Sequence, residues 1–203
     1  MVYLERWNNL FKKVGCTKNP KKQFQGIIKA YSEKHRAYHN LNHIEQCLKQ
    51  FDQVSGYLDF PDLVEIAIWY HDAIYYTRSD RNEEESALLA KRDLNDLGLM
   101  KESIRTVHDL ILSTKHDAEP KNSDTKYLID IDLSILGATP DIFKEYEKNI
   151  RKEYKWVPMF LFRKKRFEVL ESFLRRKNIF YTQLFRERYE YQARVNLNSV
   201  LSG

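Results

Sequence analysis

Hydrophobic residues recur at three- and four-residue spacing along most of the chain, and this spacing predicts α-helices. In the first such segment, residues 3–14, Trp7, Leu10, Phe11 and Val14 follow the pattern. The same spacing predicts further helices at about 20–31, 41–56, 61–74, 83–98, 104–111, 158–176 and 182–196, and one that opens at Thr139-Pro140.

Several helix ends are predicted from short polar signals. Asn19-Pro20 reads as an N-cap followed by proline in the first turn, and Pro61 opens the central helix. Residues 80–83 resemble a capping box, and Gly98 has the place of a residue just after a helix end. Residues 127–135 alternate apolar and acidic positions, but so short a stretch between helices is expected to be helical as well.

The composition fits one folded domain. The chain has 203 residues, with 6 Gly and 5 Pro, which favours long helices with short connections. We expect an all-α fold, a single domain over residues 1–203 with about eight to ten helices. No apolar run is long enough to span a membrane, and the first residues contain no signal-peptide core. Cys16 and Cys47 are expected to be reduced thiols, and the protein to be cytoplasmic.

Charge is unevenly distributed. The net charge is +5, yet residues 151–203 hold 13 Lys/Arg against 5 Asp/Glu, so the rest of the chain is about three charges negative. A basic C-terminal part suits anionic ligands, such as nucleotide phosphates, nucleic acid or a membrane surface. A solvated helix face is the simpler explanation of such a charge run.

The central apolar run, residues 63–69, is followed closely by the adjacent pair His71-Asp72. Burying two ionisable side chains at the end of a core helix is costly unless something satisfies them. A divalent metal would do so, because imidazole and carboxylate are both metal ligands.

All six histidines lie between His35 and His116. His39 and His43 are four residues apart and would share one face of a helix. Zinc proteases use the same spacing, but the glutamate that follows the first histidine in their motif is absent here. This pair alone therefore carries little weight.

In combination these motifs are more specific. The segments 38–43, 69–72 and 130–133 read His, His-Asp and Asp in that order. This order resembles the HD superfamily of metal-dependent phosphohydrolases, and most closely its branch of about 200 residues. Further matching parts extend over nearly the whole chain: Arg36-Ala37, Tyr75, Asn82-Glu83, Ser86-Ala87, 114–116, 134–137, 151–154, Glu190, Ala193-Arg194 and Asn196-Leu197.

The resemblance implies an HD-type helical bundle with a metal site built from residues 35–135, on which basic helices at 140–200 pack. It implies His43, His71, Asp72 and Asp132 as ligands, with Asp130 as a neighbour of the site or a substitute ligand. The metal would be Mn²⁺, Co²⁺, Fe²⁺, Ni²⁺, Zn²⁺ or Mg²⁺.

The resemblance also implies catalytic and substrate-binding residues. His39 is expected to act as general acid, and Asp72 to be catalytic as well as a ligand. Glu83 would anchor metal-bound water or only cap its helix. Residues expected to contact substrate are Arg36, Lys115, His116, Tyr75, Arg166 and Arg194, and His116 has binding of a second metal as its alternative role. Arg194 has a competing partner in Glu190, four residues earlier on the same helix.

The leading hypothesis is a phosphohydrolase that cleaves a small phosphate ester or anhydride, above all a nucleotide, with metal-activated water. Whether it acts as a phosphatase, phosphodiesterase or pyrophosphohydrolase is left open. The alternative is a non-catalytic HD-fold module that binds a nucleotide or a protein. Binding of nucleic acid through the basic C-terminal helices is not favoured, because no groove-reading or stacking motif accompanies the charge. No membrane partner is expected, and a homodimer is compatible with the sequence.

Overall fold

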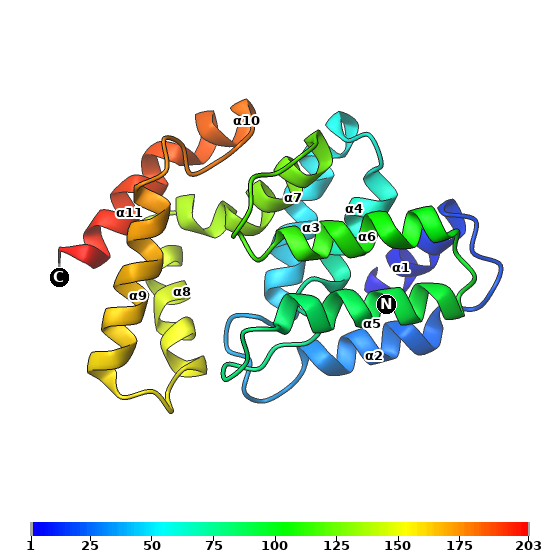
Figure 1. Ribbon diagram of the computed structural model, residues 1–203, viewed down its shortest axis with the longest axis horizontal. Helices are drawn as coiled ribbons and strands as arrows, with labels where there is room; N and C mark the ends of the chain where they lie inside the picture. The colour runs from blue at the N-terminus through cyan, green and yellow to red at the C-terminus, as the bar shows by residue number, and fades with distance from the viewer. Residues whose placement is uncertain (1, 203) are drawn as a thin grey trace. The chain divides into compact units, whose positions relative to one another are not determined.

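The computed structural model describes residues 2–202, and its regular structure within these residues is helical throughout (Figure 1). The α-helices are α1 Val2–Lys13, α2 Lys21–Tyr31, α3 Leu41–Val54, α4 Pro61–Tyr70, α5 Asn82–Asp96, α6 Lys101–Ser113, α7 Ser123–Leu133, α8 Pro140–Glu153, α9 Met159–Leu174, α10 Gln183–Phe185 and α11 Tyr191–Leu201. Short helical turns lie at Ser55–Tyr57 (η1), Ser134–Gly137 (η2) and Arg186–Glu190 (η3). The predicted all-α fold is confirmed.

The described chain divides into two compact units. The first ends at Leu128 and the second begins at Ile129, so the division falls inside α7. The single domain expected over residues 1–203, and the packing of the basic helices on the rest, stay predictions.

The first unit is centred on α4. Residues 64–70 are buried without interruption, so this helix has no solvent-facing side over seven residues. Trp69 packs edge-to-face against Trp7 of α1, with 5.6 Å between ring centroids and an interplanar angle of 83°. Phe24 of α2 packs on the same two indoles. The aromatic cluster therefore fixes the helix that leads to His71-Asp72.

Some predicted helix ends are confirmed and others are wrong. Pro61 lies in the first turn of α4, and Gly98, with φ 81°, follows the end of α5 in the left-handed region that favours glycine. The capping box at residues 80–83 is wrong, because Arg81 is the N-cap and its side chain makes no cap hydrogen bond. The Asn82 side chain instead bonds the backbone of Tyr76, accepting from its N–H at 2.9 Å.

Other differences shift a boundary by a few residues. α2 begins at Lys21 with Pro20 as its N-cap, so the predicted boundary is one residue early, but Asn19 Oδ1 does accept from the Lys21 backbone N–H at 3.0 Å. α4 ends at Tyr70 and not near residue 74, and α3 ends at Val54 before the turn η1. The segment predicted at 182–196 is helical, but it passes through the π-helical turn η3.

The second unit contains α8, α9, α10 and α11. Gly137 in η2 lies so close to η3 that an added Cβ would be 2.5 Å from Tyr189 Cβ. Asn196 of α11 fixes the same turn, since its Nδ2 donates to Leu136 O and Ala138 O, both at 2.8 Å. Within the described residues, no helix is both long enough and apolar enough to span a bilayer.

Candidate metal centre

His43 lies in the first turn of α3, where the sequence determines its position locally. Asn40 is the N-cap, and its Oδ1 accepts from the Asn42 backbone N–H at 2.9 Å. This cap fixes where the helix begins and therefore which residue faces the core. The His43 imidazole is buried.

His71 and Asp72 follow the last residue of α4. His71 Nδ1 lies 2.9 Å from Ile68 O. Because a carbonyl only accepts, Nδ1 carries a proton, and Nε2 presents a lone pair whenever the ring is neutral. A backbone carbonyl behind a metal-ligating histidine is a common arrangement, since it fixes both the ring orientation and the tautomer.

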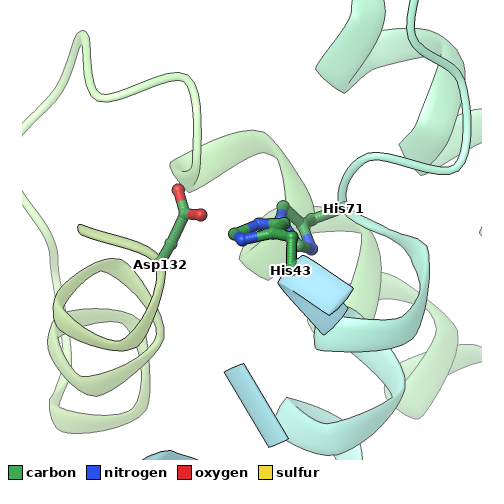
Figure 2. Close-up of side chains that lie close together, drawn as sticks. All are labelled: His43, His71 and Asp132. Carbon is green, nitrogen blue, oxygen red and sulfur yellow. The ribbon is translucent and has the colours of Figure 1, made fainter. Parts of the chain in front are cut away.

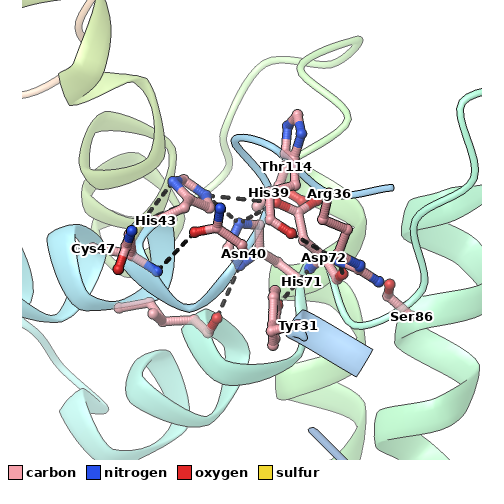
Figure 3. Close-up of polar contacts among 12 residues, drawn as sticks. Tyr31, Arg36, His39, Asn40, His43, Cys47, His71, Asp72, Ser86 and Thr114 are labelled. Carbon is pink, nitrogen blue, oxygen red and sulfur yellow. Dashed lines mark hydrogen bonds and ion pairs between the residues drawn. The ribbon is translucent and has the colours of Figure 1, made fainter. Parts of the chain in front are cut away.

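The donor atoms of these three residues converge (Figure 3). His43 Nε2 lies 3.1 Å from His71 Nε2. Asp72 Oδ2 lies 3.0 Å from His71 Nε2 and 3.5 Å from His43 Nε2. Metal–ligand bonds of about 2.0–2.2 Å place neighbouring ligand atoms about 3.0–3.5 Å apart around one ion. The three separations therefore fit the edges of one coordination sphere.

Electrostatics favour an ionised Asp72. Burial opposes ionisation, but the charges of His71, His39 and His43 and the hydrogen bond from His71 outweigh it, so the pKa of Asp72 is well below its ordinary value. A carboxylate that stays ionised among imidazole nitrogens is suited to bind a cation.

Asp132, the predicted late ligand, is carried by α7 and is half-buried. His43 and His71 belong to the first unit and Asp132 to the second, and Figure 2 labels all three side chains. All three were predicted from the sequence as ligands.

Asp130 differs from Asp132 in its surroundings. Its fully buried carboxylate accepts hydrogen bonds from Tyr181 N at 2.8 Å, Thr182 N at 2.7 Å and Thr182 Oγ1 at 2.7 Å. It therefore serves the fold of the second unit in this structure. This favours Asp132 as the ligand of the two.

No protein-family model, curated protein or solved structure matches this chain.

His39 lies beside the three donors. Its ring stacks on Tyr75, with 4.1 Å between centroids and an interplanar angle of 28°, and lies 5.9 Å from the ring of His43. Tyr75 is itself buried. His39 thus occupies one face of the Tyr75 ring, and the substrate-binding role of Tyr75 stays a prediction.

Glu83, Lys115 and His116 lie where α5 begins and just after α6 ends. Burial, together with the charges of Asp72 and Glu84, raises the pKa of Glu83. Lys115 Nζ donates to Glu84 Oε1 at 2.5 Å, so its charge is already paired. His116 has φ 59°, an uncommon conformation for a residue other than glycine. The predicted roles of these three residues stay predictions.

Arg36 is buried within the first unit, where it holds the backbone next to the site. Its guanidinium donates to Asp72 O at 2.6 Å, Ala73 O at 3.0 Å, His39 O at 3.1 Å and Glu33 Oε2 at 3.0 Å. These contacts connect the segment before α3 to the segment after α4. The expected contact between Arg36 and substrate phosphate stays a prediction.

Arg166 and Arg194 have protein partners within the second unit. The Arg166 guanidinium pairs with the Glu147 carboxylate and donates to Tyr146 Oη at 2.8 Å. Arg194 pairs with Glu190 at 2.8 Å, which confirms the competing partner expected from the sequence. Their substrate-binding roles stay predictions.

Sequence reasoning missed two residues that contact the ligands. Cys47 Sγ lies 3.7 Å from His43 Nε2, and Tyr31 Oη accepts from the Asp72 backbone N–H at 3.2 Å. Cys47 follows His43 by four residues on α3, so its helical spacing was a signal that could have found it. Tyr31 had no such signal, because its contact joins residues 41 positions apart.

Proposed function

We propose that this chain is a metal-dependent phosphohydrolase of the HD superfamily type, acting on a small phosphate ester or anhydride such as a nucleotide. The observation that carries the proposal is the separation of 3.0–3.5 Å among His43 Nε2, His71 Nε2 and Asp72 Oδ2. Two imidazole lone pairs and a carboxylate at such separations repel one another unless a proton or a cation lies between them.

His43, His71, Asp72 and Asp132 would hold the divalent ion in this proposal. The set of imidazole and carboxylate donors suits first-row transition metals. When bound, such an ion acidifies water and neutralises charge on phosphate oxygens.

His39 and Glu83 would handle the protons. His39 is held against Tyr75 beside the ligand His43, where it could give a proton to the leaving oxygen. Glu83 has a raised pKa, so it takes up a proton at higher pH than an ordinary glutamate does. That property suits a group which accepts a proton from water.

The test combines metal content with phosphate release. The purified protein is loaded with Mn²⁺, Co²⁺, Ni²⁺, Zn²⁺ or Mg²⁺, its metal content is measured by mass spectrometry, and phosphate release is followed over a panel of nucleotides. We expect Asp72→Ala to lose both bound metal and phosphate release, whereas the exposed Asp80→Ala keeps both. Phosphate release that persists in metal-free Asp72→Ala would refute the proposal.

A second candidate function is a non-catalytic module that binds a nucleotide or a protein. It is favoured by one observation: two cations next to the histidine motifs, Arg36 and Lys115, already bind the protein's own oxygens. A metal-loaded protein that binds nucleotides but releases neither phosphate nor base across the panel would favour this candidate.

A further inference from the structure

Large apolar side chains are exposed at the connection between α8 and α9 and along the start of α9. Trp156 is 47% exposed, Met159 50%, Phe160 71% and Leu161 43%. The connection lies at one end of the α8–α9 pair, near residue 155 in the colours of Figure 1. Exposed side chains of this size grouped in six residues mark an interaction surface more often than a neutral one.

The same segment is strongly basic. Residues 154–167 contain five Lys/Arg and no Asp or Glu. Lys165 pairs with Glu168, and Arg166 with Glu147. Across the described chain, no ion pair engages the exposed side chains of Lys155, Arg163 or Lys164. The charges of Lys155 and Arg163 are therefore available to an anionic partner, and that of Lys164 also acts on the nearby Glu168 carboxylate.

The backbone that presents these side chains is held firmly. Arg151 Nη1 donates to Tyr154 O at 2.8 Å, and its Nη2 donates to Val157 O at 3.0 Å. The guanidinium also lies 4.8 Å from the ring centroid of Phe162. Arg151 thus fixes the turn from α8 into α9, and this turn carries the exposed side chains.

On α9, cations and aromatic rings share one stripe. Phe160, Arg163, Lys164 and Phe167 are spaced by three and four residues, and all are exposed. Exposed rings and cations that lie side by side can make both apolar and electrostatic contacts with the surface of an anionic bilayer.

We propose that the α9 surface, composed of Lys155, Trp156, Met159, Phe160, Leu161, Arg163 and Lys164, binds the face of an anionic lipid bilayer. The three cations contact lipid headgroups, and the four apolar side chains enter the layer beneath them. Surface binding of this kind needs no membrane-spanning helix.

Charge and side-chain type favour a bilayer over two other partners. A second copy of the chain, seated face to face on this surface, would bring the unpaired cations of both copies together. Single-stranded nucleic acid prefers flat rings on which bases stack. Trp156 and Phe160 are rings of this kind, but Met159 and Leu161, the other two exposed apolar side chains, are not, and aliphatic side chains enter a lipid layer.

The test is co-sedimentation of the full chain with vesicles of phosphatidylcholine alone, or with about 30% phosphatidylserine added. Binding is expected only to the anionic vesicles. Trp7 and Trp69 are fully buried, so a blue shift of tryptophan emission would report on Trp156. Reversing charge with Lys155→Glu or Lys164→Glu should weaken binding at least about fivefold each.

Apolar variants complete the test. Met159→Ser with Phe160→Ser should weaken binding at least about tenfold. Leu88→Ser on α5, which changes an exposed leucine elsewhere, should leave vesicle binding unchanged.

Light scattering and oligonucleotide titration test the two other partners, a second copy of the chain and nucleic acid. No binding to anionic vesicles overturns the proposal, as does a dimer that Phe160→Ser dissociates, or oligonucleotide binding that exceeds vesicle binding. The experiment needs no metal and no turnover, so its outcome is separate from that of the proposed function.

Discussion

Arg36 Nη1 donates to the backbone oxygen of Asp72 at 2.6 Å. The contact holds a candidate ligand by its main chain, not by its carboxylate, and leaves the carboxylate to face His43 and His71. The Arg36 side chain is fully buried, between the rings of Tyr31 and Tyr75. A charged group in this place can orient the side chain of a candidate ligand without contacting a metal itself.

Replacing Arg36 with lysine should therefore loosen the site. Lysine cannot reproduce a fork that reaches Asp72 O and Ala73 O together, so we expect a loss of about 2 kcal/mol in the free energy of unfolding. Metal affinity, measured by calorimetry, should fall about tenfold. Arg81→Lys, at an exposed position, should change neither quantity. Unchanged metal affinity in folded Arg36→Lys would show that Arg36 does not position the ligand.

Substitutions at Asp130 and Asp132 should have different effects on stability and on metal affinity. Asp130→Asn places an amide N–H₂ group against donors at Tyr181 and Thr182, and we expect it to cost about 2–3 kcal/mol of stability while metal affinity is kept. Asp132→Asn should weaken metal binding at least about tenfold with little change in stability. Urea unfolding and calorimetry on both variants check this, and the reverse pattern would make Asp130 the ligand.

Gly137 should not tolerate a side chain. A Cβ at this position would lie 2.5 Å from Tyr189 Cβ and 2.7 Å from Tyr189 O, so η2 and η3 would have to separate. We expect Gly137→Ala to cost about 2–3 kcal/mol in urea unfolding. Gly26→Ala is the matched control, because its Cβ meets nothing within 4 Å, and it should gain about 0.5–1 kcal/mol in helix α2. Equal effects at the two glycines would contradict the close approach.

The stability that Tyr3 contributes should change with pH only in the alkaline range. Burial, with the hydrogen bond to Glu45 and the charge of Glu45, raises the pKa of Tyr3 to about 12. Because the unfolded pKa is about 10, the stability that Tyr3 contributes is complete below pH 10 and is lost as pH rises through 12. The difference in unfolding free energy between the native chain and Tyr3→Phe should shrink over that interval. A difference that stays constant would show that Tyr3 is not linked to folding in this way.

Local sequence patterns were sufficient to predict where most helices lie, but they predicted the ends of the helices less well. The start of α4 at Pro61 follows from the fixed φ of proline. Its end does not follow from any nearby residue. After Tyr70 the carbonyls of Asp72 and Ala73 bond Arg36, more than thirty positions earlier in the chain, and not the next helical turn. The spacing of hydrophobic residues contains no information on such a contact.

The candidate ligands could be predicted because they stand in motifs whose order is visible in the sequence. The groups that surround these ligands could not be predicted in this way. His43, His71 and Asp132 can each be named from the sequence. The Ile68 carbonyl that fixes the tautomer of His71 depends on how the chain leaves α4. The Glu84 carboxylate that pairs with Lys115 comes from a residue 31 positions away. A sequence shows which charged groups are present. Which of these charges are neutralised by a partner depends on tertiary packing.

The uninterrupted burial of α4 has a consequence for how the protein opens. Amide protons exchange with solvent most slowly where a helix is covered on every side, since release requires the largest unfolding event. Residues 64–70 are such a segment. Their amides should be among the last in the first unit to exchange, after the exposed turns of α2 and α5. His71 and Asp72 are attached to the end of that segment, so partial opening elsewhere would leave these two side chains anchored to structure that is still folded.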